Sequence, residues 1–130
     1  MDSRIRALYK IKPQLEGPAV ARRIIAEELS ARVAGPLLDD LMLMVSELVA
    51  NGIVHGATED NAPVMLDLCV NGSIHCRVLD HGHGFASRAR REGPGGWGGL
   101  RVVGHLADRW GHAVFASTNR SMVRTASRVM

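Results

Sequence analysis

The residues best suited to chemistry in this sequence are Glu47, Asn51 and His55, three polar side chains in an otherwise apolar stretch. They stand four residues apart, so on a helix they lie on one face, about one turn from each other. A carboxylate and an amide in apolar surroundings cost free energy unless polar partners satisfy them. Either backbone groups and water do so, or the residues line a cleft in which Asn51 offers its oxygen to a hard cation and Glu47 handles a proton.

The element that must position these side chains is predicted as a helix from Pro36 to Gly56. Proline suits the first helical position, where its missing N–H costs nothing, and glycine is the usual residue just beyond a helix end. Most positions between these ends are Leu, Met, Val or Ile. A helix that is apolar nearly all round is a buried one, so we expect this helix in the core.

Two elements are expected before this helix. Arg4 to Lys12 alternates polar and apolar residues, which predicts a half-buried strand that Pro13 ends. Gly17 to Val33 places apolar residues at helical spacing, with arginines and glutamates on the other side. This second pattern is typical of an amphipathic surface helix.

A β-hairpin is predicted after the central helix. Val64 to Val70 and Ile74 to Leu79 are strand-like runs separated by Asn71-Gly72-Ser73, and Asn-Gly between two such runs is the strongest short hairpin signal. The second run leads directly into Asp80. We therefore expect this aspartate at the end of a strand.

Glycines follow Asp80 at two places. Gly82 and Gly84 allow the backbone to turn tightly and to approach a planar ligand closely. Residues 86–99 form a basic, glycine-rich loop that opens a predicted helix from Leu100 to Trp110. Free N–H groups at a helix N-terminus favour an anion, most often phosphate. Residues 113–116 and 122–129 alternate well enough to predict a closing hairpin.

Composition limits the class of protein. The 130 residues, 46% of them hydrophobic, suit one globular domain over residues 1–130. No apolar run could cross a bilayer, and the N-terminus lacks the apolar core of a signal peptide. Cys69 and Cys76 make no disulfide framework, so we expect a reducing, cytoplasmic setting. The net charge of +3 and the two Trp, two Phe and one Tyr give little support for a nucleic-acid partner.

Three motifs occur together between residues 36 and 110, and there the sequence resembles the GHKL ATPase superfamily. Within it, the chain looks like the small RsbW-like anti-sigma-factor serine kinases. SELVANGIVHGA is similar to the N box of that family, DHGHG to its first glycine box, and GGWGGLRVVGHLADRW to its second.

The resemblance assigns roles to single residues. Glu47 corresponds to the family's general base, Asn51 to its magnesium-ligating asparagine, and Asp80 to the aspartate that recognises adenine. The other nucleotide-binding positions that it implies are Gly82, Gly84, Gly96, Gly98, Gly99, Leu100 and Ser121. The sequence departs from the pattern twice. An additional glycine, Gly99, precedes Leu100, and Ser121 stands nearest to a Gly-Thr element, of which it supplies only the hydroxyl.

The resemblance also implies a fold and a function. The fold is α+β, a two-layer α/β sandwich (Bergerat fold) with a mixed, mostly antiparallel sheet covered on one face by three helices. The function is that of a Mg²⁺- and ATP-dependent serine/threonine protein kinase of the anti-sigma-factor type. It would phosphorylate an anti-anti-sigma (STAS-domain) partner and sequester a sigma factor, and a homodimer is compatible with this. The alternative is a nucleotide-binding interaction module without phosphotransfer, which the intact Glu47 disfavours and the altered lid favours.

Overall fold

The computed structural model describes residues 4–55, 62–80, 103, 105–115 and 121–129. Its elements, in chain order, are β1 (Ile5–Ile11), α1 (Gly17–Leu29), α2 (Gly35–His55), β2 (Val64–Val70), β3 (Ser73–Asp80), β4 (Arg109–Phe115) and β5 (Ser121–Val129). The first five follow the sequence expectations closely. The main difference among them is α1, which ends at Leu29 instead of Val33.

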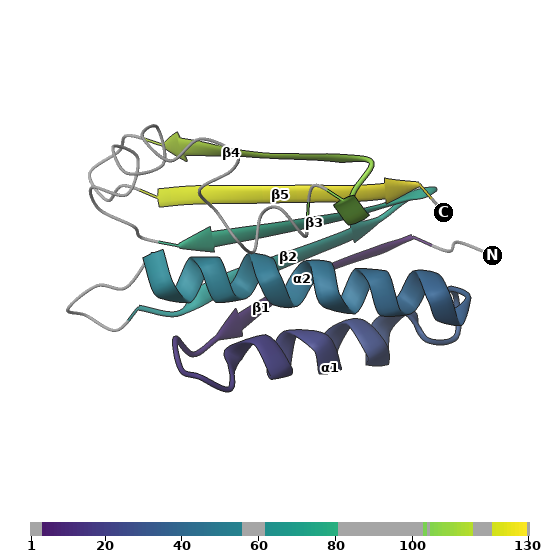
Figure 1. The fold of residues 1–130 in the computed structure, drawn as a ribbon, viewed down its shortest axis with the longest axis horizontal. Helices are drawn as coiled ribbons and strands as arrows, with labels where there is room; N and C mark the ends of the chain where they lie inside the picture. Colours follow the sequence, from purple (N-terminus) through teal and green to yellow (C-terminus); the bar gives the residue numbers. More distant parts are fainter. Residues whose placement is uncertain (1–3, 56–61, 81–102, 104, 116–120, 130) are drawn as a thin grey trace.

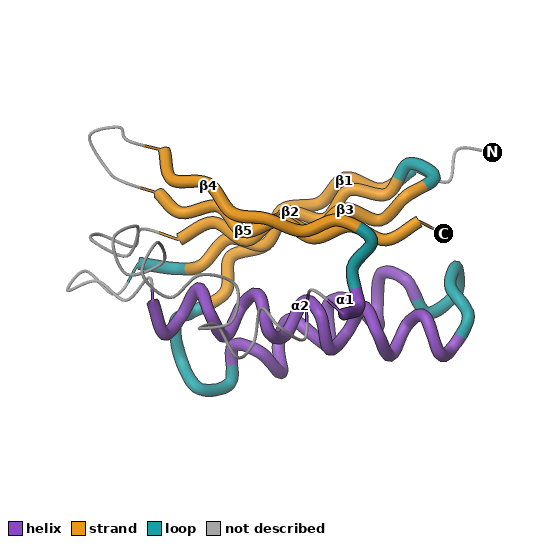
Figure 2. Tube along the Cα trace, turned by 45° about the horizontal axis from the view of Figure 1, so that its top comes forward, coloured by secondary structure: helices purple, strands orange, loops and turns teal. Residues whose placement is uncertain are grey.

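The five strands form one sheet in the order β1-β2-β3-β5-β4. The expected mixed sheet is antiparallel in all four pairings of the described strands. Helices α1 and α2 lie side by side on one face of it, and the other face carries no described helix (Figures 1 and 2). Because the chain runs out along α1 and back along α2, it returns to the end of the sheet where β1 stopped. Strand β2 must therefore run opposite to β1.

The expected third helix is only partly confirmed. Val103, His105 and Leu106 are helical, and the Ala107 N–H donates to the Val103 carbonyl oxygen at 2.8 Å. The expected end at Trp110 is wrong, because β4 already begins at Arg109 and pairs with β5 there. Sheet pairing thus takes precedence over helical periodicity at this junction. The rest of the expected helix lies outside the described residues.

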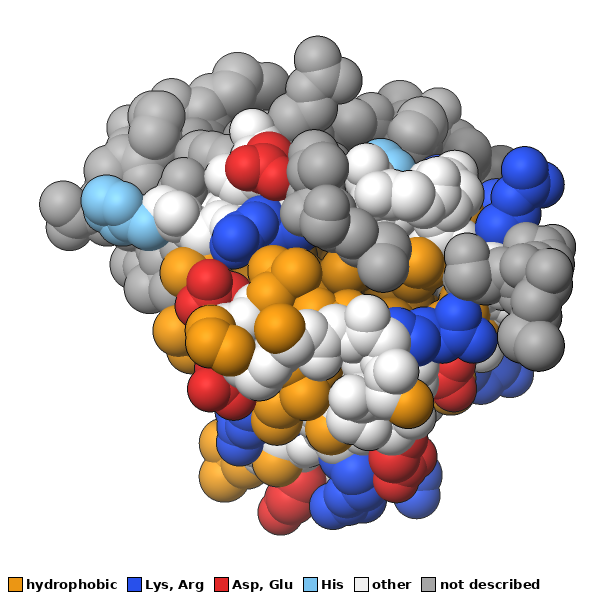
Figure 3. Space-filling model, turned by 90° about the vertical axis from the view of Figure 1, so that its right-hand side faces the viewer, with side chains coloured by type: hydrophobic (Ala, Val, Ile, Leu, Met, Phe, Trp, Pro, Cys, Tyr) orange, Lys and Arg blue, Asp and Glu red, His pale blue; other side chains and the backbone are white. Residues whose placement is uncertain are grey.

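The core lies between the two layers. Helix α2 contributes Leu41, Met44, Val45, Leu48 and Val49, all fully buried, and β2 and β3 contribute Leu66, Leu68, Ile74, Cys76 and Val78. Figure 3 faces the end of the molecule where α2 begins, and hydrophobic side chains fill the middle of this face. The expectation that α2 is a core helix is confirmed, although Leu43 and Val54 are exposed on its outer side. Among the described residues, no helix is both long and apolar enough to cross a membrane.

One guanidinium group joins three separate segments. Arg128, near the end of β5, donates from Nη1 to the Leu106 carbonyl oxygen at 2.8 Å and to Asp40 of α2 at 3.3 Å. Its Nε lies 3.8 Å from Asp108 Oδ2. Hydrogen bonds that involve a charged group are about twice as strong as neutral ones. Arg128 therefore stabilises the position of residues 106–108 against both layers.

The two cysteines should differ in reactivity. Cys69 and Cys76 lie on opposite faces of the sheet, and Cys76 is fully buried. Burial, and secondarily the charge of Asp67, raises the pKa of the Cys76 thiol to about 12. Since the thiolate is the reactive form, we expect a thiol reagent at neutral pH to label one cysteine in the native protein and two after denaturation. A Cys69→Ser variant should show no native labelling, and equal labelling rates for the two thiols would contradict this assignment.

Candidate functional site

The ends of one helix and two strands meet at one end of the molecule. The last turns of α2 carry Asn51, β3 ends at Asp80, and β5 begins at Ser121; all three ends lie at the left in Figure 1. Asp80 pairs in register with Met122, so the backbone of Ser121 is next to the position opposite Asp80. Residues that are distant in the sequence are thus brought together by α2 and the two central strands.

Gly52 makes the contact between α2 and the sheet possible. A Cβ atom at this position would lie 3.2 Å from Val78 Cγ1, 3.4 Å from Val64 Cγ1 and 3.5 Å from Asp80 Oδ2. The missing side chain lets α2 approach β2 and β3 closely and places the Asn51 turn beside Asp80. Sequence reasoning missed Gly52. Its signal was a glycine inside a helix, which costs roughly 1 kcal/mol against alanine and so needs a packing reason.

Asn51 is held by its own helix. The side chain is 7% exposed, and its Nδ2 donates to the Glu47 carbonyl oxygen at 2.9 Å. This bond identifies the nitrogen end of the amide, so the oxygen Oδ1 points away from the backbone of the preceding turn. The structure therefore supports part of both interpretations of Asn51, satisfaction by the backbone and binding of a cation. The backbone satisfies the amide nitrogen, and the amide oxygen is oriented to act as an acceptor or ligand.

Glu47 lies one turn before Asn51 and is half-buried. Its backbone oxygen already holds the Asn51 amide, so the two residues form one local unit on α2. The third polar residue of this row, His55, is the last residue of α2, and the structure describes only its backbone.

Asp80 is a carboxylate at 2% exposure. Its neighbours include Gly52 of α2, which has no side chain, and the apolar side chain of Val78 on β3. A carboxylate can accept several hydrogen bonds, so a planar ligand that brings an N–H donor suits such a place. The glycines expected to complete this site, together with Leu100, lie outside the described residues. They are Gly82, Gly84, Gly96, Gly98 and Gly99.

The donor atoms here suit magnesium that arrives with a nucleotide. Among the described residues, no three His, Cys, Asp or Glu side chains gather into a metal site. Asn51 offers an amide oxygen, and oxygen atoms are the ligands that Mg²⁺ prefers. Because Mg²⁺ keeps several waters and shares substrate phosphates, one or two protein oxygens are sufficient.

Gly52→Ala should weaken nucleotide binding. The added methyl group would lie 3.2 Å from Val78 Cγ1, so the Val78 side chain or its strand must give by a few tenths of an ångström, which disturbs the contact beside Asp80. Overpacking of this kind costs about 1–3 kcal/mol, and we expect an affinity loss of roughly fivefold or more by calorimetry. Gly35→Ala is the matched control, since nothing lies within 4 Å of a Cβ there. An unchanged affinity in Gly52→Ala would mean that the α2–β3 contact does not shape the site.

Comparison with known proteins agrees with this geometry. Residues 11–124 match the family model of the histidine kinase-like ATPase domain. A similar solved structure is that of the RsbU and RsbW domains of Rv1364c from Mycobacterium tuberculosis, with a TM-score of 0.71 and 16% identity over 96% of this chain and 32% of that one. This chain thus spans about a third of that chain's length. The TM-score shows a shared fold, and at this low identity the likeness shows the fold alone.

Comparison with curated proteins gives no match. The family match contains Glu47, Asn51 and Asp80, and it runs from the last residue of β1 into β5. The expected two-layer α+β fold and the resemblance to the GHKL superfamily are confirmed together. The chain belongs to the histidine kinase-like ATPase domain family.

Proposed function

We propose that this chain is a cytoplasmic, Mg²⁺- and ATP-dependent serine/threonine protein kinase of the anti-sigma-factor type. It phosphorylates an anti-anti-sigma (STAS-domain) protein and sequesters a sigma factor. Family membership supports ATP as the nucleotide. The observation that carries the finer proposal is the pairing of Glu47 with Asn51 on α2, beside the buried carboxylate of Asp80.

Each of the three residues has a separate task in this proposal. Asp80 accepts a hydrogen bond from the adenine amino group, which fixes the base. Asn51 contributes its amide oxygen to Mg²⁺, which neutralises phosphate charge when bound with ATP. Glu47 accepts the proton of the attacking hydroxyl. The hydroxyl oxygen bonds to the γ-phosphorus, the bond from that phosphorus to the bridging oxygen breaks, and ADP leaves.

A carboxylate base favours a hydroxyl acceptor. Serine and threonine hydroxyls hold their protons at neutral pH and need a base, whereas a neutral imidazole nitrogen can attack without one. Positioning and charge neutralisation supply most of phosphoryl-transfer catalysis, so a site with few functional groups is sufficient. The fold that this chain shares with the RsbW domain of Rv1364c is consistent with the anti-sigma-factor type.

The proposal is tested with γ-labelled ATP and the STAS-domain proteins of the same organism. We expect label on the partner that is stable to acid and lost in base, as phosphoserine and phosphothreonine are. Acid-labile label would indicate a histidine acceptor and overturn the serine/threonine assignment. ATP binding without transfer to the partner would support the interaction module, the alternative that the additional Gly99 favours.

A further inference from the structure

The first strand carries a basic stripe on the sheet face that α1 and α2 leave uncovered. We define the basic stripe as Arg4, Arg6, Leu8, Lys10 and Lys12, every second residue along β1 and its two flanks. All five side chains are exposed, and Leu8 is 62% exposed in the middle. Four cations thus surround one exposed apolar side chain in a regular row.

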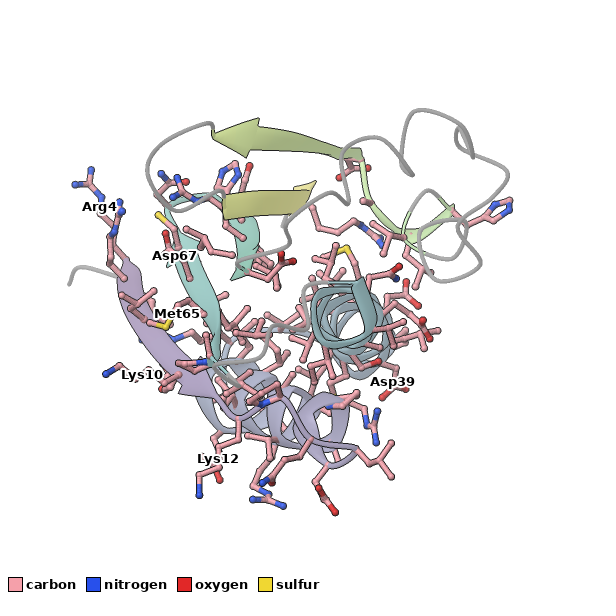
Figure 4. The ribbon with its side chains drawn as sticks, turned by 90° about the vertical axis from the view of Figure 1, so that its left-hand side faces the viewer. Arg4, Lys10, Lys12, Asp39, Met65 and Asp67 are labelled. Carbon is pink, nitrogen blue, oxygen red and sulfur yellow. The ribbon has the colours of Figure 1, made fainter. Side chains whose placement is uncertain are left out.

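Strand β1 is an edge of the sheet. Among the described strands it pairs with β2 alone, since the strand order begins with β1. Figure 4 shows Arg4, Lys10 and Lys12 pointing away from the sheet and the helices. An open hollow of about 530 Å³ lies where β1 begins, lined in part by Arg4, Arg6 and Asn71. An edge strand of this kind offers backbone N–H and C=O groups to another extended chain.

The described residues of this face carry more positive than negative charge. Asp67 of β2 lies on the same face, with its side chain 10% exposed, 3.8 Å from Arg6 Nη2 and 3.5 Å from Arg77 Nε. Two arginines therefore share this one carboxylate. Lys10 and Lys12 add further positive charge along the same edge. The described part of this face thus has a net positive charge that suits an acidic partner.

We propose that the open edge of β1 accepts an extended acidic segment of a partner protein as an added strand. Alternate residues of a strand stand about 6.8 Å apart on one face, so the added strand has the same spacing as the basic stripe. Acidic residues at alternate positions would lie opposite Arg4, Arg6, Lys10 and Lys12, and an apolar residue would lie opposite Leu8. Backbone hydrogen bonds provide affinity, and the alternating side chains provide selectivity.

Two other occupants fit less well. A second copy that paired β1 with β1 would bring cations opposite cations, which is destabilising. A nucleic acid would leave Leu8 without an apolar contact and would find no aromatic ring in the stripe for base stacking. Tyr9 is the aromatic residue of β1, and it lies on the helix side, where its hydroxyl donates to Glu28 at 2.7 Å.

The basic stripe is separate from the nucleotide site. The family match begins at residue 11, so all but one of the five stripe residues precede it. Asp80 lies on the helix-covered face of β3, whereas the stripe lies on the opposite face of the sheet. Strand addition at β1 therefore does not depend on the proposed phosphotransfer, and its failure would leave that proposal standing.

The probe for this proposal is a nine-residue peptide, ETETLTETE, titrated into the ¹⁵N-labelled chain of 130 residues. The peptide sequence is the same in both directions, so it presents its acids to the stripe in either strand orientation. We expect amide shifts and slower hydrogen exchange at alternate β1 residues. The double variant Lys10→Glu/Lys12→Glu should lower the affinity by about tenfold or more, since two attractive pairs become repulsive.

Matched controls separate strand addition from general attraction between opposite charges. Arg22→Glu/Arg23→Glu makes the same change in net charge on the exposed side of α1 and should leave peptide binding unchanged. The peptide TTEELEETT has the same composition without the alternation and should bind more weakly. Equal binding of both peptides, equal loss in both double variants, or no binding of ETETLTETE would overturn the proposal. So would tighter binding of a nine-nucleotide oligothymidine, or self-association that the Lys10→Glu/Lys12→Glu variant changes.

Discussion

Replacing Glu47 by Gln should lower the rate of phosphotransfer by about a hundred- to ten-thousand-fold and change ATP affinity little, because general-base help is worth this much in rate. Glutamine keeps the size of the side chain but cannot take the proton of the attacking hydroxyl. The Asn51 amide binds the backbone oxygen of residue 47, so the substitution leaves that hydrogen bond intact. Single-turnover transfer to the partner and calorimetry of ATP binding measure the two effects separately.

Two further variants make this experiment selective. Asn51→Ala should reduce both affinity and rate, because the proposed role of Asn51 is to hold Mg²⁺ with the nucleotide. Glu27→Gln removes an exposed carboxylate from α1 and should change neither. Sigma-factor binding should survive Glu47→Gln, since it does not need proton transfer. Phosphotransfer by Glu47→Gln at the wild-type rate would remove Glu47 from the chemistry and leave the binding module as the better explanation.

The sequence was informative where the signals are local. The proline and glycine at the two ends of α2, the Asn-Gly turn between β2 and β3, and the alternation in β1 each predict structure within a few residues. The structure has Gly35–His55, Ser73–Asp80 and Ile5–Ile11 at these places. Helix periodicity is also a local property, so the four-residue spacing of Glu47 and Asn51 correctly predicts that both lie on one face of α2.

What sequence reasoning could not give depends on contacts between distant segments. The approach of Gly52 to Val78 and Asp80 exists only once α2 lies on the sheet. The bond from Arg128 to Asp40 joins residues 88 positions apart. Strand order is likewise a tertiary property, so the edge position of β1 was not visible in its alternating pattern. The start of β4 at Arg109 was missed because the helical pattern of the sequence continues to Trp110. In the structure Arg109 and Trp110 instead pair with Ser127 and Ala126 of β5.

Asp80 should make the protein select ATP over GTP. The adenine amino group donates a hydrogen bond that a carboxylate accepts, whereas guanine has a carbonyl oxygen at that position. The carboxylate is 2% exposed, so water cannot easily replace a missing donor. Sites built to pair with a ligand's hydrogen-bonding group reject the unpaired analogue by up to 10⁴–10⁵, and we expect at least about a hundredfold here.

Asp80→Asn should weaken ATP binding and narrow this selectivity, because an amide can rotate to offer a donor to the guanine carbonyl. Calorimetry with non-hydrolysable ATP and GTP analogues measures both constants, and thermal unfolding shows whether each variant is folded. Asp67→Asn is the matched control. It removes another nearly buried carboxylate, on the opposite face of the sheet, and should lower stability through its two arginine partners while leaving nucleotide selectivity unchanged. Equal affinities of the wild-type protein for the two analogues would contradict the assignment of Asp80 to adenine.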